Sequence, residues 1–371
     1  MKKIYFLILL SLLLGCSKEK LADRSVVDDN TITQTLTELD TYIEQAFVKP
    51  YGISVEYRWD KTKAPNGEHL FPPQTDKVKD VLETIKYLWL ETYTLPNMGG
   101  NDFFKGKAPV KIYMYGGANL DANGVERISN AEAPAIEMHL YNVNAFQKKD
   151  FADVFILMRS VHHQFAKRLL ELYPYERDAF SRISQQKYVY STQNIIKRRD
   201  IESNYIRKIS DCRGSNLDEF IYIIASDADF ANVKRGYFST GRIIPAIRVD
   251  KRFCDIRGDD TVITEGYRAH QNGFLTLHAS LSPEDDFAEI ISATLTHTKS
   301  EIDQALTIAK TPDRDPNPEV QERNNQEAQA AFNAISRKKD MVYDYFKKEI
   351  GINLDRMQII SIQRIKSLNN K

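Results

Sequence analysis

Apolar residues recur at helical spacing in several stretches of this 371-residue chain. The clearest stretch runs from Phe151 to Leu172, where an apolar residue returns every three or four positions and predicts a helix with one buried face. Earlier helices are predicted over residues 36–47 and 72–94. A later helix is predicted from "SPEDDFAEIISATLTHT", where Ser282 is suited to the N-cap and Pro283 to the first helical position.

Three shorter stretches alternate apolar with polar residues and are rich in β-formers. They predict strands over residues 53–59, 110–117 and 135–144. Strands mixed with helices, without a regular strand–helix–strand alternation, predict an α+β fold with a small mixed sheet. We expect an N-terminal sheet part over about residues 33–150 and a helical part over about residues 151–371.

The N-terminal sequence "MKKIYFLILLSLLLGCSKEK" is typical of an exported lipoprotein. Two lysines precede an apolar run from Ile4 to Leu14, which is short for a membrane span, and Gly15 then precedes Cys16. We predict a lipoprotein signal peptide over residues 1–15, lipidation of Cys16 and a polar tether over residues 16–32. A plain signal peptide and an N-terminal anchor helix are the alternatives.

The composition is that of a chain with a substantial core, at 42% hydrophobic and 27% charged residues, and the formal net charge is +0. This balance gives no basic field that would attract nucleic acid, so we expect no nucleic-acid partner. Besides Cys16, the chain holds Cys212 and Cys254, which could form a disulfide or remain as two buried thiols.

The helix over "SVHHQFAKRLLELYP" has part of a zinc-binding pattern. A hydrolytic zinc helix reads H-E-x-x-H, with two histidine ligands one turn apart and a glutamate as general base. Here His163 holds the first ligand position, Gln164 the general-base position and Lys167 the second ligand position. An amide takes no proton from water, and an ammonium has no lone pair for zinc. From the pattern alone, an ordinary core helix is the favoured interpretation.

Several segments, in order along the chain, resemble one bacterial family. They are "LDTYIEQAFVKPYGISVEYRWD", "IEMHLYNVNAF", "VHHQFAKRL", "NGFLTLHASLSPEDDFAEIIS" and "YDYFKKEIGINLDRMQ". The chain resembles the Bacteroidetes substrate-import-associated zinc metallohydrolase lipoproteins, also described as zinc-binding metallopeptidases. "VHHQFAKRL" resembles the zinc helix of that family, which reads "HHEFAH". The resemblance implies a zincin-like metallopeptidase fold.

The resemblance also implies roles for individual residues. His163 and Glu289 would be retained zinc ligands, Lys167 would mark a lost ligand, and Gln164 a degenerate general base. Zinc is the cofactor of the family, and we expect it to be absent or weakly bound in this chain. In its place we expect an ion pair between Lys167 and Glu289, and we expect Lys167→Met to destabilise the protein.

The resemblance implies an outer-membrane lipoprotein that takes part in substrate import beside a TonB-dependent transporter and its lid lipoprotein. We expect it to be a catalytically inactive binding or accessory protein, with a peptide or glycopeptide as ligand. A structural lipoprotein without cleft function is a further alternative. The other alternative is an active zinc metallohydrolase with a rearranged metal site, for which the candidate ligands are His139, His162, His270, His278, His297, Glu171 and Asp286.

Overall fold

The structure is a computed structural model, and it describes residues 36–59, 70–119, 133–188, 190, 247–248, 261–262, 272–276, 278–310 and 317–368. Two compact units divide at Thr41 and Tyr42, and the features below belong to the second unit unless stated. Residues 1–32, which carry the predicted signal peptide, Cys16 and the tether, lie outside the described residues. Cys212, Cys254 and His270 also lie outside them.

The first half of the chain contains a small sheet and several helices. Its elements are α3 (Glu38–Ile43), η1 (Glu44–Val48), α4 (Lys49–Tyr51), β1 (Ser54–Glu56), α5 (Thr75–Ile85), η3 (Lys86–Leu90), α6 (Glu91–Tyr93), β2 (Lys111–Met114), β3 (Glu137–Leu140), η4 (Val143–Ala145), α7 (Phe151–Leu172), α8 (Arg177–Arg182) and η5 (Gln185–Lys187). Of these, η1 and η3 are π-helical segments that continue the preceding helix.

The second half is mainly helical among its described residues. Its elements are β4 (Ile247–Arg248), β5 (Thr261–Val262), η6 (His278–Ser280), α13 (Pro283–Thr296), α14 (Lys299–Lys310), α15 (Pro318–Tyr345), η7 (Phe346–Ile350) and α16 (Leu354–Leu368). β4 and β5 form a short antiparallel pair. Every helix in the described part of the chain is too short or too polar to cross a membrane.

The sheet holds three described strands in the order β1-β2-β3, and all of them are parallel. Ser54 lies beside Lys111, and Tyr113 lies beside His139. The predicted α+β class is confirmed, but these strands do not form the mixed sheet that we expected. The helices α5 and α6 lie between β1 and β2 in sequence, and such a crossover returns the chain to the sheet in the same direction.

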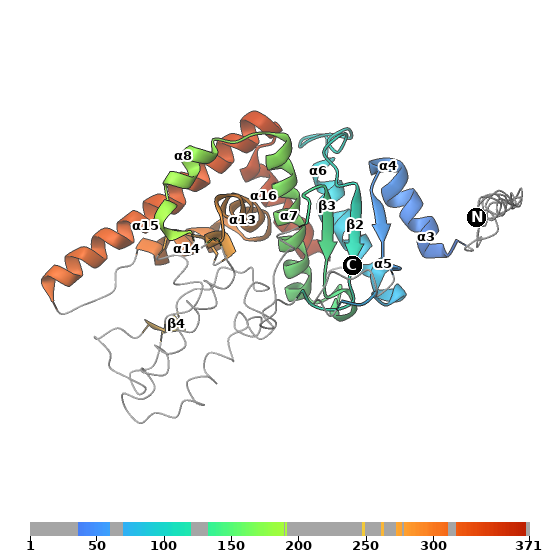
Figure 1. Cartoon of the computed structure of the whole chain (residues 1–371), viewed down its shortest axis with the longest axis horizontal. Coiled ribbons are helices and arrows are strands. Elements are labelled where there is room, and N and C mark those ends of the chain that lie inside the picture. The colour runs from blue at the N-terminus through green and yellow to red at the C-terminus, as the bar shows by residue number, and fades with distance from the viewer. Residues whose placement is uncertain are drawn as a thin grey trace, which may run out of the picture. The chain divides into compact units, whose positions relative to one another are not determined.

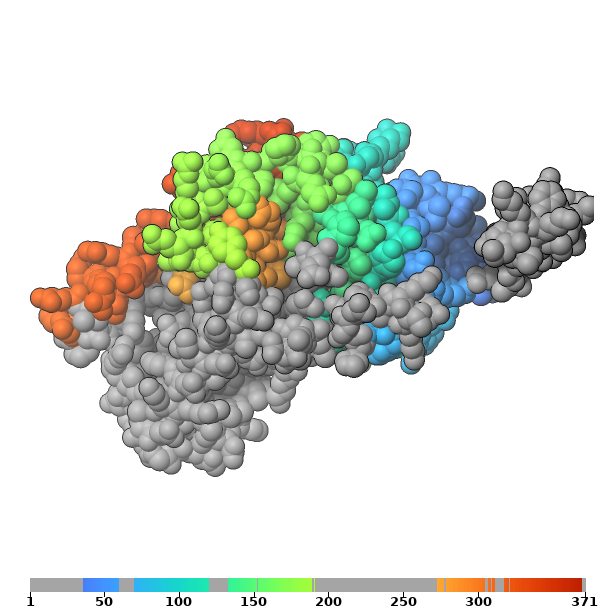
Figure 2. All heavy atoms as spheres, in the orientation of Figure 1, coloured from blue at the N-terminus to red at the C-terminus, as the bar shows by residue number. Residues whose placement is uncertain are grey.

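Strand β2 alternates in burial, as a strand with one face on the core does, whereas in β3 His139 is buried as well as its two neighbours. Ile112 and Met114 of β2, and Met138 and Leu140 of β3, are buried. Helix α7 packs beside β3, and Figure 1 shows it between the sheet and α13. In the space-filling view, the green atoms of the α7 region adjoin the teal atoms of the β3 region (Figure 2).

An aromatic cluster fixes α7 against the N-terminal helices. The Phe165 ring of α7 lies 5.2 Å from the rings of both Trp89 and Tyr93 and 5.4 Å from that of Phe104, measured between centroids. Phe165 is 1% exposed, so the apolar stripe predicted from sequence is the buried face of the helix. The observed helix covers the predicted interval from Phe151 to Leu172.

Helix α13 is the central helix of the second half. It packs along α7 and also contacts α15 and α16, and nearly all of its residues are buried. A helix surrounded in this way needs a well-defined start. Ser282 supplies it as predicted, because its Oγ accepts a hydrogen bond from the Asp285 N–H at 3.1 Å, and Pro283 follows as the first helical residue.

Candidate metal centre between α7 and α13

Two rows of charged side chains face each other across the contact of α7 and α13. On α7, Arg159, His163 and Lys167 are spaced four residues apart and therefore lie on one face of the helix. On α13, Asp285 and Glu289 have the same spacing. Since the residues in each row share a face, this contact brings opposite charges together in the interior of the protein.

Glu289 is at the buried end of this arrangement, with 0% of its surface exposed. Its Oε2 forms an ion pair with the Arg159 guanidinium and accepts a hydrogen bond from Thr276 Oγ1 at 2.6 Å. Its Oε1 lies 2.8 Å from His163 Nδ1. Burial raises the pKa of Glu289, but the charge of Arg159 and the contact with His163 outweigh it and hold the pKa well below its usual range.

Asp285 lies on the other side of the His163 ring. His163 Nε2 is 3.4 Å from Asp285 Oδ1, and Lys167 Nζ donates to the same oxygen at 3.1 Å. Burial alone would raise the pKa of Asp285, but His163, His278 and Lys167 lower it far below the ordinary value. The carboxylate is therefore ionised at neutral pH.

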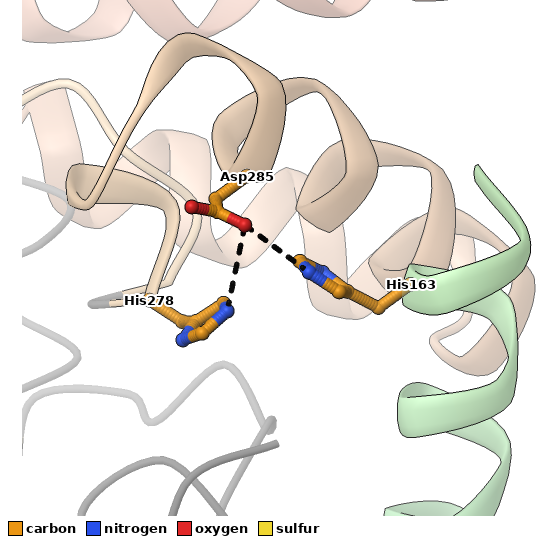
Figure 3. Close-up of side chains that lie close together, drawn as sticks. All are labelled: His163, His278 and Asp285. Carbon is orange, nitrogen blue, oxygen red and sulfur yellow. Dashed lines mark ion pairs between the residues drawn. The ribbon is translucent and has the colours of Figure 1, made fainter. Parts of the chain in front are cut away.

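The ring of His163 is held between the two carboxylates. Burial lowers the pKa of His163, but the contacts with Asp285 and Glu289 outweigh it and raise the pKa above its ordinary value. Because Glu289 lies at Nδ1, it fixes the orientation of the ring and directs Nε2 toward Asp285 (Figure 3).

His278 approaches the same carboxylate from the segment before α13. Its Nε2 is 3.9 Å from Asp285 Oδ1, and its ring is 4.9 Å from that of His163 between centroids. One ligand atom each from His163, His278 and Asp285 lies within 4.8 Å of the others, and all three residues are buried. Burial and the nearby charge of His163 lower the pKa of His278 to about 4, so the ring is neutral near pH 7.

The distances between these ligand atoms can be compared with those of a zinc site. Zinc bonds of about 2.0–2.1 Å in a tetrahedral site separate neighbouring ligand atoms by about 3.3 Å. The 3.4 Å from Asp285 to His163 is close to that separation, and the 3.9 Å to His278 would have to shorten on metal binding. The pattern H-E-x-x-H itself does not fit, since Lys167 holds the second ligand position as an ammonium. The donor set that fits is therefore His163, His278 and Asp285.

Gln164, at the position that the resemblance implies for the general base, hydrogen-bonds to the backbone of β3, an outer strand among those that the structure describes. Its Oε1 accepts a hydrogen bond from the His139 backbone N–H at 2.8 Å, and its Nε2 donates to the His139 carbonyl at 2.9 Å. Nε2 also lies 3.0 Å from Ser160 Oγ. The carboxamide thus takes the place of a neighbouring strand at β3, and it is 8% exposed.

The predicted site residues are thus brought together in part. His163 and Glu289 are in contact, but through Nδ1, which leaves Asp285 as the carboxylate on the Nε2 side. The ion pair expected between Lys167 and Glu289 was wrong, because Lys167 pairs with Asp285 and Arg159 pairs with Glu289. Lys167 lies one turn beyond His163 on α7, where it reaches Asp285 in the first turn of α13.

The other candidate ligands have different surroundings, with His278 alone joining the cluster among those that the structure describes. The Tyr115 hydroxyl lies 2.9 Å from Nδ1 of His139, His162 packs near Tyr93, His297 caps α13, Glu171 pairs with Arg168, and Asp286 pairs with Lys338 and Tyr188. Sequence reasoning missed Asp285, Arg159 and Thr276. The complementary charges at four-residue spacing on the two predicted helices were a signal that could have found Asp285 and Arg159.

Comparison with known proteins identifies the family. Residues 32–355 match the family described as "Putative zinc-binding metallo-peptidase". The chain belongs to this family. A crystal structure described as that of a putative zinc-binding metallo-peptidase from Bacteroides caccae is similar, with a TM-score of 0.54 and 18% sequence identity over 94% of this chain and 97% of that one. At this identity the likeness shows a shared fold. No curated protein matches the sequence.

Proposed function

We propose that this chain is a non-hydrolytic member of the family, a lipoprotein that binds a substrate of import without cleaving it. The observation that carries the proposal is the carboxamide of Gln164, held by the His139 backbone where the resemblance implies a general base. An amide in this position accepts no proton from water, and the loss of a general base typically reduces the rate by about 10²–10⁴-fold.

The charges around the cluster support the same conclusion. The carboxylate of Asp285 is engaged by Lys167, and that of Glu289 by Arg159, Thr276 and His163. Both carboxylates also have strongly lowered pKa values, whereas a general base at neutral pH needs a pKa near 7. Neither therefore substitutes for the missing glutamate, which disfavours the alternative of an active hydrolase with a rearranged site.

A cavity along the N-terminal part of α7, from Asp153 to Ser160, offers room for a ligand. Its volume is about 940 Å³, and its lining includes Lys77, Asp80, Tyr141, Lys148, Ile156 and Ser160. Ser160 is also a hydrogen-bond partner of Gln164, so the cavity adjoins the position of the missing base. Charged and aromatic side chains in one cavity suit a peptide or a glycan-linked peptide.

The resemblance supplies the location and partners of the proposal. Acylation of Cys16 would anchor the chain at the outer membrane, beside a TonB-dependent transporter and its lid lipoprotein. Growth of the producing cells with labelled palmitate tests the anchor: label in the wild-type chain and none in Cys16→Ser is expected. Equal labelling of both chains would refute lipidation at this residue.

The catalytic part is tested with the full chain, purified in detergent and supplied with zinc. Quenched fluorescent peptides serve as substrates, an active zinc endopeptidase as the positive control, and the His163→Ala variant as the measure of contaminating activity. We expect the wild type and His163→Ala to give the same background rate. Hydrolysis by the wild type that His163→Ala abolishes would overturn the proposal.

The binding part is tested with labelled peptides and glycopeptides by fluorescence anisotropy. We expect saturable binding to the wild type and its loss in Ile156→Trp, a change that fills the cavity. Binding that Ile156→Trp leaves unchanged would exclude this cavity as the ligand site.

A further inference from the structure

His278 lies outside the zinc-helix pattern, yet its ring reaches the face of α7 that carries His163. The segment of η6, just before Ser282, brings it there, and Figure 3 shows both imidazoles directed at Asp285. The three residues come from three separate elements, η6, α7 and α13. The convergence therefore depends on the tertiary fold and is not a by-product of helical spacing.

The contacts of His163 orient its Nε2 for metal binding. Metal-binding histidines commonly donate their other ring N–H to a carboxylate, which fixes the tautomer and strengthens the ligand. Glu289 is such a carboxylate, 2.8 Å from Nδ1, and it is itself held by Arg159 and Thr276. When Nδ1 carries the proton, the lone pair of Nε2 is directed to the side where Asp285 and His278 lie.

We propose that His163, His278 and Asp285 form a site for a divalent transition metal of the zinc class, with His278 as the ligand that replaces position 167. Two imidazoles and one carboxylate are a common donor set for zinc. This metal site deepens the proposed function. It rests on that function in one respect: the metal would take part in binding and not in hydrolysis. A metal here would hold α7, η6 and α13 together.

Lys167 competes with the metal for Asp285. Its Nζ donates to Oδ1 at 3.1 Å, the oxygen that both imidazoles face. The Lys167 side chain is 27% exposed, so the ammonium can leave the carboxylate and move into water when a metal arrives. Removing this ammonium relieves both the competition and the repulsion between like charges. Lys167→Met should therefore bind the metal more tightly than the wild type.

Zinc binding to the full chain in detergent gives a direct test. We measure zinc content by elemental mass spectrometry after equilibration with zinc alone, and affinity by competition with a chromogenic chelator. We expect about one zinc per chain, at least about 100-fold weaker binding in His278→Gln, and at least about 10-fold tighter binding in Lys167→Met. His162→Gln is the matched control, a buried histidine of α7 whose loss should leave zinc affinity unchanged.

Cobalt binding provides a second readout, which does not require the His278→Gln variant to fold. Cobalt(II) in a four-coordinate site with nitrogen and oxygen ligands gives a visible absorption band. The band should be present in the wild type, stronger at a given cobalt concentration in Lys167→Met, and unaffected in His162→Gln. A wild-type chain and a Lys167→Met chain that both lack zinc and the cobalt band would overturn the proposal.

These outcomes separate the two proposals. Zinc binding without peptide hydrolysis supports both. Absence of zinc together with absence of hydrolysis overturns the metal site and leaves the non-hydrolytic role intact. Zinc binding with hydrolysis that requires His278 supports the metal site and overturns the non-hydrolytic role. Zinc binding that His278→Gln leaves unchanged assigns the metal to other ligands and refutes the inference.

Discussion

The ion pair between Arg159 and Glu289 is the contact of the site on which stability should depend most. The two side chains are 1% and 0% exposed, and the pair joins α7 to α13. Replacing Arg159 by Met would leave the Glu289 carboxylate buried without its cation. Breaking a buried pair in this way typically costs about 3–5 kcal/mol of unfolding free energy.

Lys167→Met is the matched control for this prediction. It removes a cation from the same face of α7, but the Lys167 side chain is 27% exposed and its partner Asp285 is 11% exposed. Because Lys167 is partly exposed and Asp285 keeps its contact with His163, we expect this loss to be about 1 kcal/mol or less. The destabilisation that we expected of Lys167→Met through an unpaired Glu289 is therefore expected of Arg159→Met instead, because Arg159 is the residue that pairs with Glu289.

Thermal and urea unfolding followed by circular dichroism measure both variants. With a melting shift of about 2–4 °C per kcal/mol, Arg159→Met should lower Tm by about 6–20 °C and Lys167→Met by about 4 °C or less. Adding Glu289→Gln to Arg159→Met removes the buried charge and should restore about 1 kcal/mol or more. The reasoning fails if Arg159→Met is no worse than Lys167→Met, or if the double variant is less stable than Arg159→Met alone.

Three further predictions concern the helices that carry the site. Phe165→Ala should cost about 3–5 kcal/mol of unfolding free energy, because the ring fills the aromatic cluster under α7; a loss below about 1 kcal/mol in urea unfolding would contradict this. Ser282→Ala should cost about 1 kcal/mol through loss of the N-cap of α13, whereas Ser282→Asp should retain most of the stability in the same assay. Burial lowers the pKa of His162 to about 3, so the ring is neutral when folded, and its contribution is intact above about pH 6.5 and is lost as the pH falls toward 3. His162→Phe should therefore reduce the dependence of stability on pH in that window, by up to about 1.4 kcal/mol per pH unit; equal slopes for both chains would refute the shift.

Local patterns predicted the elements of this site better than its contacts. The apolar spacing of α7 and the Ser282–Pro283 start of α13 could be read from sequence, because each depends on residues within a few positions of one another. The contact of Arg159 with Glu289 joins residues 130 positions apart. Periodicity indicates which face of a helix is buried, but it does not specify the partner of that face.

Periodicity also fails to tell which carboxylate, Asp285 or Glu289, lies among the metal-binding residues. Both carboxylates lie on the face of α13 that meets α7, so spacing alone leaves them equivalent. The distinction arises because Glu289 lies opposite Arg159 and Thr276, whereas Asp285 lies opposite Lys167 and His278. The direction of the parallel sheet was also unavailable locally, since alternation along a strand is the same in parallel and mixed sheets.

The two hydrogen bonds between Gln164 and the backbone of His139 bear on how this site could change in evolution. A single nucleotide change could convert Gln164 to Glu, the residue that the resemblance implies for a general base, but it would remove the N–H donor that the His139 carbonyl now uses. A carboxylate oxygen would then face that carbonyl at the position of Nε2, with repulsion in place of a hydrogen bond. The change to Glu thus carries a structural penalty unless the backbone of β3 adapts as well, so these two hydrogen bonds favour glutamine at position 164.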